Sequence, residues 1–480
     1  MNYFCSMKLP LPIFLWALFL LTTNNVFCQK IDVKWGEVGQ QFLSNPDEAN
    51  FVKMDAKDLD AIGVKFKTNT NMYKTVYGKT QAYITKSHVY YPYFETTAGV
   101  EKLYLQETDQ QGKLKGGLKL LSSDPYTTDG PKANYNGSEP GLFISKNKEL
   151  ILRVTLSGLY SKPIPEKITF TVWDENLKIK WTKQQQFTKY SDVDFGDESE
   201  RITDDGQVIL VARIEEKQKA KKGDIIYKRS VFFITRDNMK EVEVSLGEER
   251  IPNSAELTFL PDNKLAITGS YRNANNSYFN LTNNGRYVMI YDIEKGVILS
   301  KSVLPYDISL FPQKHPSAKD IAFGIKSIHD PYILELKNGN FVLLSSYGSN
   351  ADNVYGANAL VTGLTAGLDK QYETVVRISS CVSHLEYPHL FGVNNQAVLV
   401  YGNCEGPPIK YTLRATFIDE QGKVMPSIEI PYEGKDFDLR SVKQLSDNKL
   451  LLETRPHNDF EYEQSGHVQT NFKQCIVTFN

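Results

Sequence analysis

Histidine is the residue type in this sequence whose placement most invites a chemical interpretation. An imidazole changes charge near neutral pH and binds metal ions, so grouped histidines are candidates for catalysis or ligation. Six of the seven histidines fall in long, irregular stretches: His315, His329, His384, His389, His457 and His467. None has the short spacing of a known metal motif. We take His329, His384 and His389 as candidate ligand-binding residues, expect no metal or cofactor, and assign no catalytic residue.

An acidic run is the second feature with chemical potential. Its five carboxylates are Asp192, Asp194, Asp197, Glu198 and Glu200. Several oxygens from one loop suit calcium, but the helix-loop-helix calcium pattern needs glycine at its sixth position, and Gly196 falls one place early. We therefore interpret the run as a solvated acidic loop.

Aromatic rings are the third feature. The sequence holds 27 tyrosines, and the densest group is Tyr90-Tyr91-Pro92-Tyr93-Phe94. Exposed rings stack on sugars, but the alternation of a strand places half of such rings in the core. The core interpretation is favoured for this group.

The elements that must position these side chains repeat along the chain. Polar turns precede β-branched or aliphatic runs at Asn147, Asp205, Asn263, Gly339, Asn395 and Asn448. Asn, Asp and Gly tolerate the positive φ of tight hairpins. Successive turns are 58, 58, 76, 56 and 53 residues apart, with a second family of turns between them. Four short antiparallel strands per period, with hardly any helical pattern, are typical of a β-propeller blade.

The blade number follows from a weaker turn at Lys86-Ser87-His88, which brings the turns to seven. We predict an all-β fold, a β-propeller of seven four-stranded blades, with six or eight blades as alternatives. The sequence stops within a strand at residues 474–479, so the last blade has three strands of its own. We expect its outer strand to come from residues 64–68 or 73–77, which would remove an exposed sheet edge.

The chain start has the features of a secretory signal peptide. Lys8 precedes an apolar run over residues 9–21, which is too short and too interrupted by proline for a membrane span. Cleavage after Cys28 would leave Gln29 first. A lipoprotein anchor at Cys28 is disfavoured because Phe27 is large where a small residue is needed. The predicted division is 1–28 signal peptide, 29–80 N-terminal extension with the ring-closing strand, and 81–480 β-propeller.

Charge and cysteine content limit the partners and the scaffold. Without residues 1–28, 54 basic and 57 acidic side chains leave a net charge of −3, which is no nucleic-acid footprint. Three cysteines would remain, Cys381, Cys404 and Cys475, too few for a disulfide-built scaffold. A bridge between Cys381 and Cys404 and a set of buried free thiols are equally open.

One stretch carries a resemblance. Residues 167–181, Lys-Ile-Thr-Phe-Thr-Val-Trp-Asp-Glu-Asn-Leu-Lys-Ile-Lys-Trp, are followed by residues 190–195 and by the turn Asp204-Asp205-Gly206. An alternating strand with a closing Trp, an Asp-rich stretch and a glycine-containing turn in this order resembles a family of exported propeller-like proteins of Bacteroidetes-type bacteria. The resemblance covers about residues 140 to 310. Its motifs are structural and the family has no assigned activity, so it implies fold and export only.

Propeller geometry indicates which loops bind. Turns such as Asp205 and Asp237 share one face, so the loops between second and third strands and the connections between blades share the other. Long loops on a rigid scaffold commonly bind ligands. We expect a ligand to contact loops 215–224, 272–285 and 455–466 and the connections bearing the three candidate histidines.

The function expected from these features is binding. We predict a non-enzymatic binding or scaffold protein of the cell envelope, periplasmic or secreted to the cell surface. We expect a monomer whose partner is a protein or glycan, with no nucleic-acid partner and no transmembrane segment after signal removal. The alternative is a polysaccharide-active lyase or hydrolase. Two carboxylates roughly 5 to 9 Å apart, or a Tyr–His pair beside an Arg at the channel mouth, would favour that alternative.

Overall fold

The fold was analysed in a computed structural model of the 480-residue chain. The residues that the structure describes are 31–37, 40–42, 51–53, 83–97, 100–109, 113–125, 142–157, 167–187, 190–195, 201–216, 227–273, 283–310, 332–349, 356–378, 388–405, 410–432, 438–455 and 473–480.

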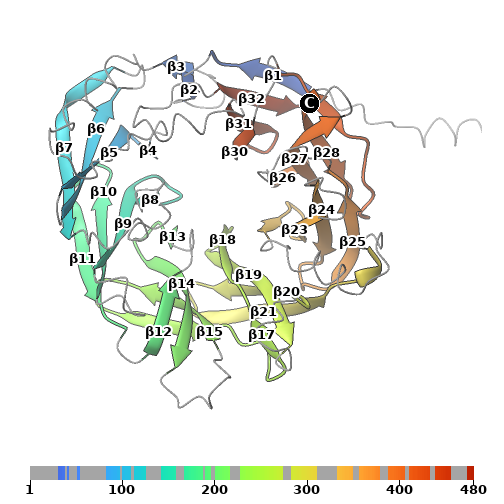
Figure 1. The fold of residues 1–480 in the computed structure, drawn as a ribbon, viewed down its shortest axis with the longest axis horizontal. Helices are drawn as coiled ribbons and strands as arrows, with labels where there is room; N and C mark the ends of the chain where they lie inside the picture. The colour runs from blue at the N-terminus through green and yellow to red at the C-terminus, as the bar shows by residue number, and fades with distance from the viewer. Residues whose placement is uncertain are drawn as a thin grey trace, which may run out of the picture.

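Seven antiparallel sheets stand around one axis and form a seven-bladed β-propeller, as predicted (Figure 1). Strands are given from the innermost outward. Blade 1 is β4 (Tyr83–Ile84), β5 (Val89–Thr97), β6 (Val100–Thr108) and β7 (Leu114–Pro125), and blade 2 is β8 (Leu142–Ile144), β9 (Leu150–Ser157), β10 (Lys167–Asp174) and β11 (Ile179–Gln185). In blades 3 and 4 two short segments share the innermost position: blade 3 is β12 (Tyr190–Phe195) with β13 (Arg201–Ile202), then β14 (Val208–Glu216), β15 (Tyr227–Ile234) and β16 (Met239–Glu243), and blade 4 is β17 (Arg250–Pro252) with β18 (Glu256–Leu260), then β19 (Lys264–Asn273), β20 (Gly285–Asp292) and β21 (Val297–Pro305).

The remaining three blades repeat this order. Blade 5 is β22 (Tyr332–Glu335), β23 (Phe341–Ser349), β24 (Gly356–Leu364) and β25 (Lys370–Val376); blade 6 is β26 (His389–Val393), β27 (Gln396–Glu405), β28 (Lys410–Ile418) and β29 (Ile428–Ile430); blade 7 is β30 (Asp438–Ser446), β31 (Lys449–Arg455), β32 (Lys473–Phe479) and β1 (Ile31–Trp35). A short helix, η1 (Ile308–Leu310), follows blade 4, and β2 (Gln40–Phe42) pairs with β3 (Phe51–Lys53) in a separate hairpin. No helix among the described residues is long and apolar enough to cross a membrane.

The hydrophobic core lies in layers between successive blades, because alternate residues of each strand face opposite neighbours. Phe170 and Val172 of β10 are buried and pack with Leu210 of β14 in the layer between blades 2 and 3. Ile209, one residue earlier in β14, packs instead with Ile267 of β19 in the next layer. Each fully buried side chain of this size stabilises the fold by about 2 kcal/mol.

The turns that carried the prediction occupy equivalent positions. Each of the six predicted turns, and the weaker one after β4, joins the innermost strand of a blade to its second strand. Gly339 (φ 80°), Asn263 (φ 54°) and Asn395 (φ 65°) adopt the positive φ expected of tight hairpins. The turns between third and outer strands lie at the same ends of the strands, so both families share one face.

Ring closure uses an N-terminal strand, but not the one expected. β1 pairs antiparallel with β32, with Ile31 opposite Phe479 and Trp35 opposite Cys475. The prediction placed this strand at residues 64–68 or 73–77, which lie outside the described residues. The sequence Ile-Asp-Val-Lys-Trp alternates apolar and charged residues, and its apolar side chains pack against the core of blades 6 and 7. This alternation was overlooked, because the residues that follow it lack a strand pattern.

Lysines of outer strands also connect successive blades. The Nζ atom of Lys183 in β11 donates to the carbonyl oxygens of Thr235 and Asn238, at 3.0 Å and 2.9 Å, in the outer turn of blade 3. Lys240 in β16 repeats the contact one blade later, donating to the carbonyl oxygen of Gly296 at 2.8 Å. The Lys183 bond adds to the one that the Asn238 carbonyl already accepts from the Thr235 amide, so these lysines reinforce the outer turns of the neighbouring blades.

A buried ion pair joins blades 4 and 5. The Nη2 atom of Arg286 in β20 contacts Glu373 Oε1 in β25 and donates to Thr362 Oγ1 at 2.7 Å. The Thr362 hydroxyl in turn donates to the same Glu373 oxygen at 2.9 Å. The Arg286 side chain is fully buried, so the pair lacks the solvent screening that weakens surface ion pairs.

Candidate functional site

Of the three candidate histidines, the structure describes only His389. It is the first residue of β26, the innermost strand of blade 6, and not part of a connection as expected. His329 and His384 lie outside the described residues, and so do the central parts of loops 215–224, 272–285 and 455–466. The grouping of the three histidines therefore remains a prediction.

Other sequence features fall in more ordinary places. Tyr90 and Tyr91 of the aromatic group are buried in β5, in line with the core interpretation. The acidic run begins in a strand and not in a loop, because β12 pairs with β14 and sets Asp194 opposite Arg213. Cys475 is a buried free thiol, and the Cys381–Cys404 bridge falls on residues whose side chains are not described.

Titratable side chains gather instead along the ring axis. Six titratable residues lie on innermost strands or on the turns that follow them, and each side chain is exposed or partly buried. We call this set the axial surface. Its members are Lys148, Arg201, Tyr332, Glu335, His389 and Lys443. They come from blades 2, 3, 5, 6 and 7. Four of these groups, Tyr332, Glu335, His389 and Lys443, have shifted pKa values, and shifted pKa values are a physical signal of a functional site.

Tyr332 is the most exposed aromatic residue of this surface. It begins β22 and leaves 51% of its surface exposed, while the next residue, Ile333, is buried between blades 4 and 5. Burial of part of the side chain raises the pKa of Tyr332, and the charge of Arg201 opposes that shift. The protonated phenol is therefore able to donate a hydrogen bond to a ligand at neutral pH.

His389 lies on the neighbouring innermost strand. Its ring stacks on Phe391, with centroids 6.5 Å apart and planes 24° apart. Burial lowers the pKa of His389 to about 4, so the imidazole is neutral at neutral pH. A neutral imidazole offers one hydrogen-bond donor and one acceptor.

Two further axial groups have charges disfavoured by their surroundings. Burial raises the pKa of Glu335, against the opposing charge of Lys264, and its Oε2 atom has no hydrogen-bond partner among the described residues. Burial lowers the pKa of Lys443, and the charge of Lys148 lowers it further. The Lys443 side chain is exposed to solvent.

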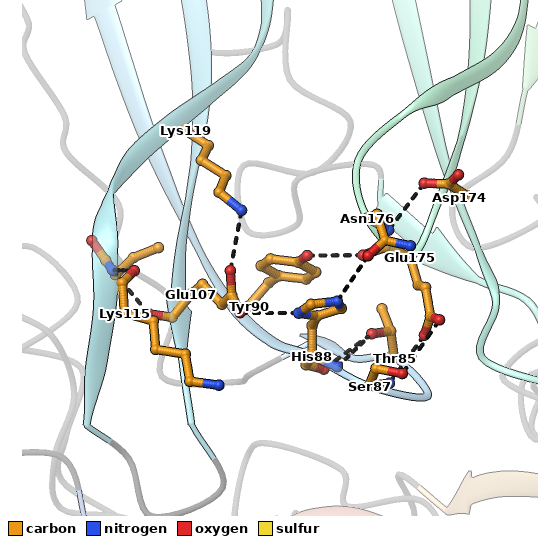
Figure 2. Close-up of polar contacts among 11 residues, drawn as sticks. Thr85, Ser87, His88, Tyr90, Glu107, Lys115, Lys119, Asp174, Glu175 and Asn176 are labelled. Carbon is orange, nitrogen blue, oxygen red and sulfur yellow. Dashed lines mark hydrogen bonds and ion pairs between the residues drawn. The ribbon is translucent and has the colours of Figure 1, made fainter.

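A second polar cluster joins blades 1 and 2 on the face of the short turns (Figure 2). His88, in the turn after β4, places Nδ1 2.9 Å from Glu107 Oε1 and Nε2 3.2 Å from Asn176 Oδ1. The His88 ring also stacks on Tyr90, whose hydroxyl donates to the carbonyl oxygen of Glu175 at 2.8 Å.

Glu107 holds this cluster on the blade 1 side. Burial alone would raise its pKa, but hydrogen bonds from His88 and Lys119 outweigh that effect and lower it. The Lys119 Nζ atom lies 3.1 Å from Glu107 Oε2. Because both ring nitrogens of His88 and both carboxylate oxygens of Glu107 meet a protein partner, we interpret the cluster as a connection between blades and not as a ligand site.

Sequence reasoning missed the axial residues because it looked only at loops. A signal was present: Glu335 and Lys443 each lie a few residues before a recognised turn, at Gly339 and Asn448. A polar residue there belongs to an innermost strand and must lie near the axis. The same register could have found Tyr332.

Comparison with known proteins adds no function. No protein-family model matches the chain, and no curated protein matches it. Among solved structures, a chimera of an apocarotenoid oxygenase with RPE65 is 13% identical, with a TM-score of 0.35 over 74% of this chain and 71% of that chain. An ulvan lyase of polysaccharide lyase family PL25 is 10% identical, with a TM-score of 0.38 over 82% of this chain and 90% of that chain. Likeness at this level carries no argument about activity.

Proposed function

We propose that this protein is an exported β-propeller that binds a protein or glycan of the cell envelope on its axial surface. The observation that supports this most directly is Tyr332, which is 51% exposed on an innermost strand. A partly exposed aromatic ring with a hydroxyl donor suits a ligand with both apolar and polar faces.

The neighbouring groups suit recognition more than chemistry. His389 is neutral and supplies a donor and an acceptor, and the charge of Arg201 acts near Tyr332. Few, fixed polar groups around an apolar ring are the usual composition of a binding site. A rigid seven-bladed ring holds them without requiring the binding loops to order first.

The test is binding of the full chain to an array of defined glycans and to purified envelope proteins. We expect Tyr332→Ala to weaken binding about tenfold, the loss of one stacked ring. The matched control is Ile179→Ala, since Ile179 is 58% exposed on the outer strand β11, far from the axis. Equal binding by the parent and Tyr332→Ala, or equal loss in Ile179→Ala, would contradict the proposal.

A polysaccharide-active enzyme is the second candidate, because the charge of Arg201 acts on Tyr332 and His389 begins the neighbouring innermost strand. The pKa directions weigh against it. A raised pKa makes Tyr332 a poor base, and a pKa of about 4 makes His389 a weak one at neutral pH. This candidate predicts that new reducing or unsaturated ends appear when polysaccharide is incubated with the parent protein. It predicts that no such ends appear with the Tyr332→Phe variant.

Export and monomeric state belong to the same proposal. Cleavage after Cys28 would leave Gln29 first and preserve β1, which begins at Ile31. N-terminal sequencing of protein recovered from the envelope or medium tests the cleavage position, and light scattering tests the monomer. A retained leader or a stable dimer would require revision of the corresponding part.

A further inference from the structure

The turn that carries His88 is fixed by backbone contacts. The His88 amide donates to Thr85 Oγ1 at 3.0 Å, and the His88 carbonyl oxygen accepts from the Thr85 amide at 2.9 Å. The amide of Ser87 donates to the Glu175 carboxylate at 3.0 Å, in the outer turn of blade 2 (Figure 2). Contacts on both blades therefore set the direction in which the His88 ring leaves its turn.

Both nitrogens of the His88 ring face oxygen atoms, and the two oxygens belong to different blades. Nδ1 lies 2.9 Å from Glu107 Oε1 of blade 1, and Nε2 lies 3.2 Å from Asn176 Oδ1 of blade 2. A neutral imidazole has one N–H donor and one acceptor nitrogen, so it donates to only one of these oxygens. The imidazolium has two N–H donors and serves both. The arrangement therefore fits the charged ring better than the neutral one.

The blade 1 side of the ring keeps its negative charge throughout the range in which histidine titrates. Burial alone would raise the pKa of Glu107, but hydrogen bonds from His88 and Lys119 lower it below the ordinary value of 4.5. The cation next to His88 in its own turn, Lys86, is paired with Glu149 of blade 2 at 2.6 Å. Between about pH 5 and pH 8 the imidazole is therefore the group of this cluster whose charge changes.

The blade 2 side of the ring is also negative. Glu175 and Asp174 lie together in the outer turn of that blade. Burial raises the pKa of Tyr90, and the charges of the carboxylates around it raise it further. The His88 ring stacks on the Tyr90 ring, with centroids 5.5 Å apart, so it lies in the same negative field. A negative field favours the charged form of an imidazole.

The cluster stands at the edge of the apolar layer between blades 1 and 2, which we call the blade 1–2 seam. Its buried residues are Tyr90, Leu103, Leu105, Leu142, Ile151 and Trp173. Tyr90 belongs to both the seam and the cluster, since its hydroxyl donates to the carbonyl oxygen of Glu175 at 2.8 Å. A change at His88 is therefore passed directly to the packing of the seam.

We propose that His88 is a pH-dependent connection between blades 1 and 2, which donates to Glu107 and Asn176 together in mild acid and loosens the blade 1–2 seam when the ring loses a proton. In the neutral ring one nitrogen presents a lone pair to an oxygen, so an attractive contact becomes a repulsive one. The contribution to stability is present in mild acid and is lost as pH rises. It does not depend on what the axial surface binds.

The test is amide hydrogen exchange of the full chain at about pH 5.5 and about pH 8, on either side of the histidine range. Mass spectrometry reads peptides that cover residues 83–91 and 174–179. Each rate is divided by that of an unstructured peptide at the same pH, which gives a protection factor. The deciding variant is His88→Gln, whose amide does not change charge. The control is Lys86→Met, which removes an exposed ion pair between the same blades and keeps the imidazole.

We expect the protection factors of the parent to fall about tenfold from the lower to the higher pH, the loss of one charge-assisted hydrogen bond. His88→Gln should show a change of less than about twofold between the two pH values. Lys86→Met should retain the fall seen in the parent. Because the parent is compared with His88→Gln, the effects of other groups that titrate in this range cancel. Circular dichroism confirms that each variant is folded.

A second variant, Asn176→Asp, keeps the test decisive if His88→Gln does not fold. A carboxylate at this position accepts and does not donate, so protection in mild acid should equal or exceed that of the parent. Two results would overturn the proposal. One is the same dependence on pH in the parent and in His88→Gln. The other is lower protection of Asn176→Asp in mild acid, because the Asn176 amide would then be the donor to a neutral ring.

Discussion

The indole nitrogen of Trp35 donates a hydrogen bond of 2.8 Å to the carbonyl oxygen of Pro431. Trp35 closes β1, the outer strand of blade 7, whereas Pro431 follows the outer strand of blade 6. The Trp35 ring also meets Tyr432 edge to face, with centroids 5.1 Å apart. The closing strand is thereby fastened to its neighbouring blade as well as to β32.

Replacing Trp35 by Ala should lower the free energy of unfolding by about 2 to 3 kcal/mol, the sum of a partly buried aromatic ring and one hydrogen bond. Urea denaturation measures this change when unfolding is followed by circular dichroism, whose signal does not depend on Trp35. The control is Lys34→Ala, an exposed position on the same strand, with an expected change below about 0.5 kcal/mol. Equal effects of the two substitutions would contradict the assigned register.

Deleting residues 29–35 should leave the edge of β32 unpaired, and we expect concentration-dependent aggregation. Light scattering over a dilution series checks this. Deleting residues 64–77 instead leaves β1 in place and should give a monomer. A monomeric first variant, or an aggregating second one, would mean that the ring closes with the later residues.

The Arg286–Glu373 pair should show strong coupling. Arg286→Met removes the buried cation of Glu373, whose other carboxylate oxygen lies 3.6 Å from the partly exposed Lys370 Nζ atom, and should cost about 3 to 5 kcal/mol of unfolding free energy. Arg286→Met combined with Glu373→Gln removes that charge and should recover about 2 kcal/mol of the loss. A double-mutant cycle by urea denaturation measures the coupling, and strictly additive effects would refute it.

The Glu107 cluster should make stability depend on pH. The folded pKa of Glu107 is lowered, so its contribution is fully present above the ordinary value of 4.5 and is lost as pH falls through the folded pKa. Glu107→Gln should therefore cost about 1 to 2 kcal/mol at pH 7 and progressively less in acid. Glu149→Gln, in an exposed ion pair, should cost below about 0.5 kcal/mol. A pH-independent cost of Glu107→Gln would contradict the assignment.

His389 should also make the protein less stable in acid, because burial disfavours its charged form. Burial lowers the pKa of His389 from 6.5 to about 4. Between these two pH values the imidazole is protonated in the unfolded chain and neutral in the folded protein. Stability of the parent should fall as pH drops from 6.5 toward 4, and His389→Gln should remove that part of the decline. Urea denaturation across this range measures it; parallel curves for parent and variant would show that His389 titrates normally.

The repeating turns were sufficient to predict the blades, because hairpin chemistry at residues such as Asn263 and Gly339 is local. Pairings between distant residues were not predictable in the same way. The partner of β1 is set by which strand of a closed ring lacks an edge neighbour, and nothing near Ile31 in the sequence encodes that. His88 likewise finds Asn176 only after two blades have packed together. The axial positions of Tyr332 and Lys443 follow from their distance in sequence to the turn that ends each innermost strand. The prediction considered the long loops and not these strands.

The antiparallel pairing of Ile31 with Phe479 joins the first strand of the propeller to its last strand in sequence. During synthesis β1 is made before the other propeller strands, and its partner β32 is made after them. β1 therefore has no strand neighbour until β32 has been made. A chain cut short within β32 can complete every earlier hairpin and still present two unpaired edges to proteases. A chain that lacks β32 therefore has no partner for β1 and leaves the ring open.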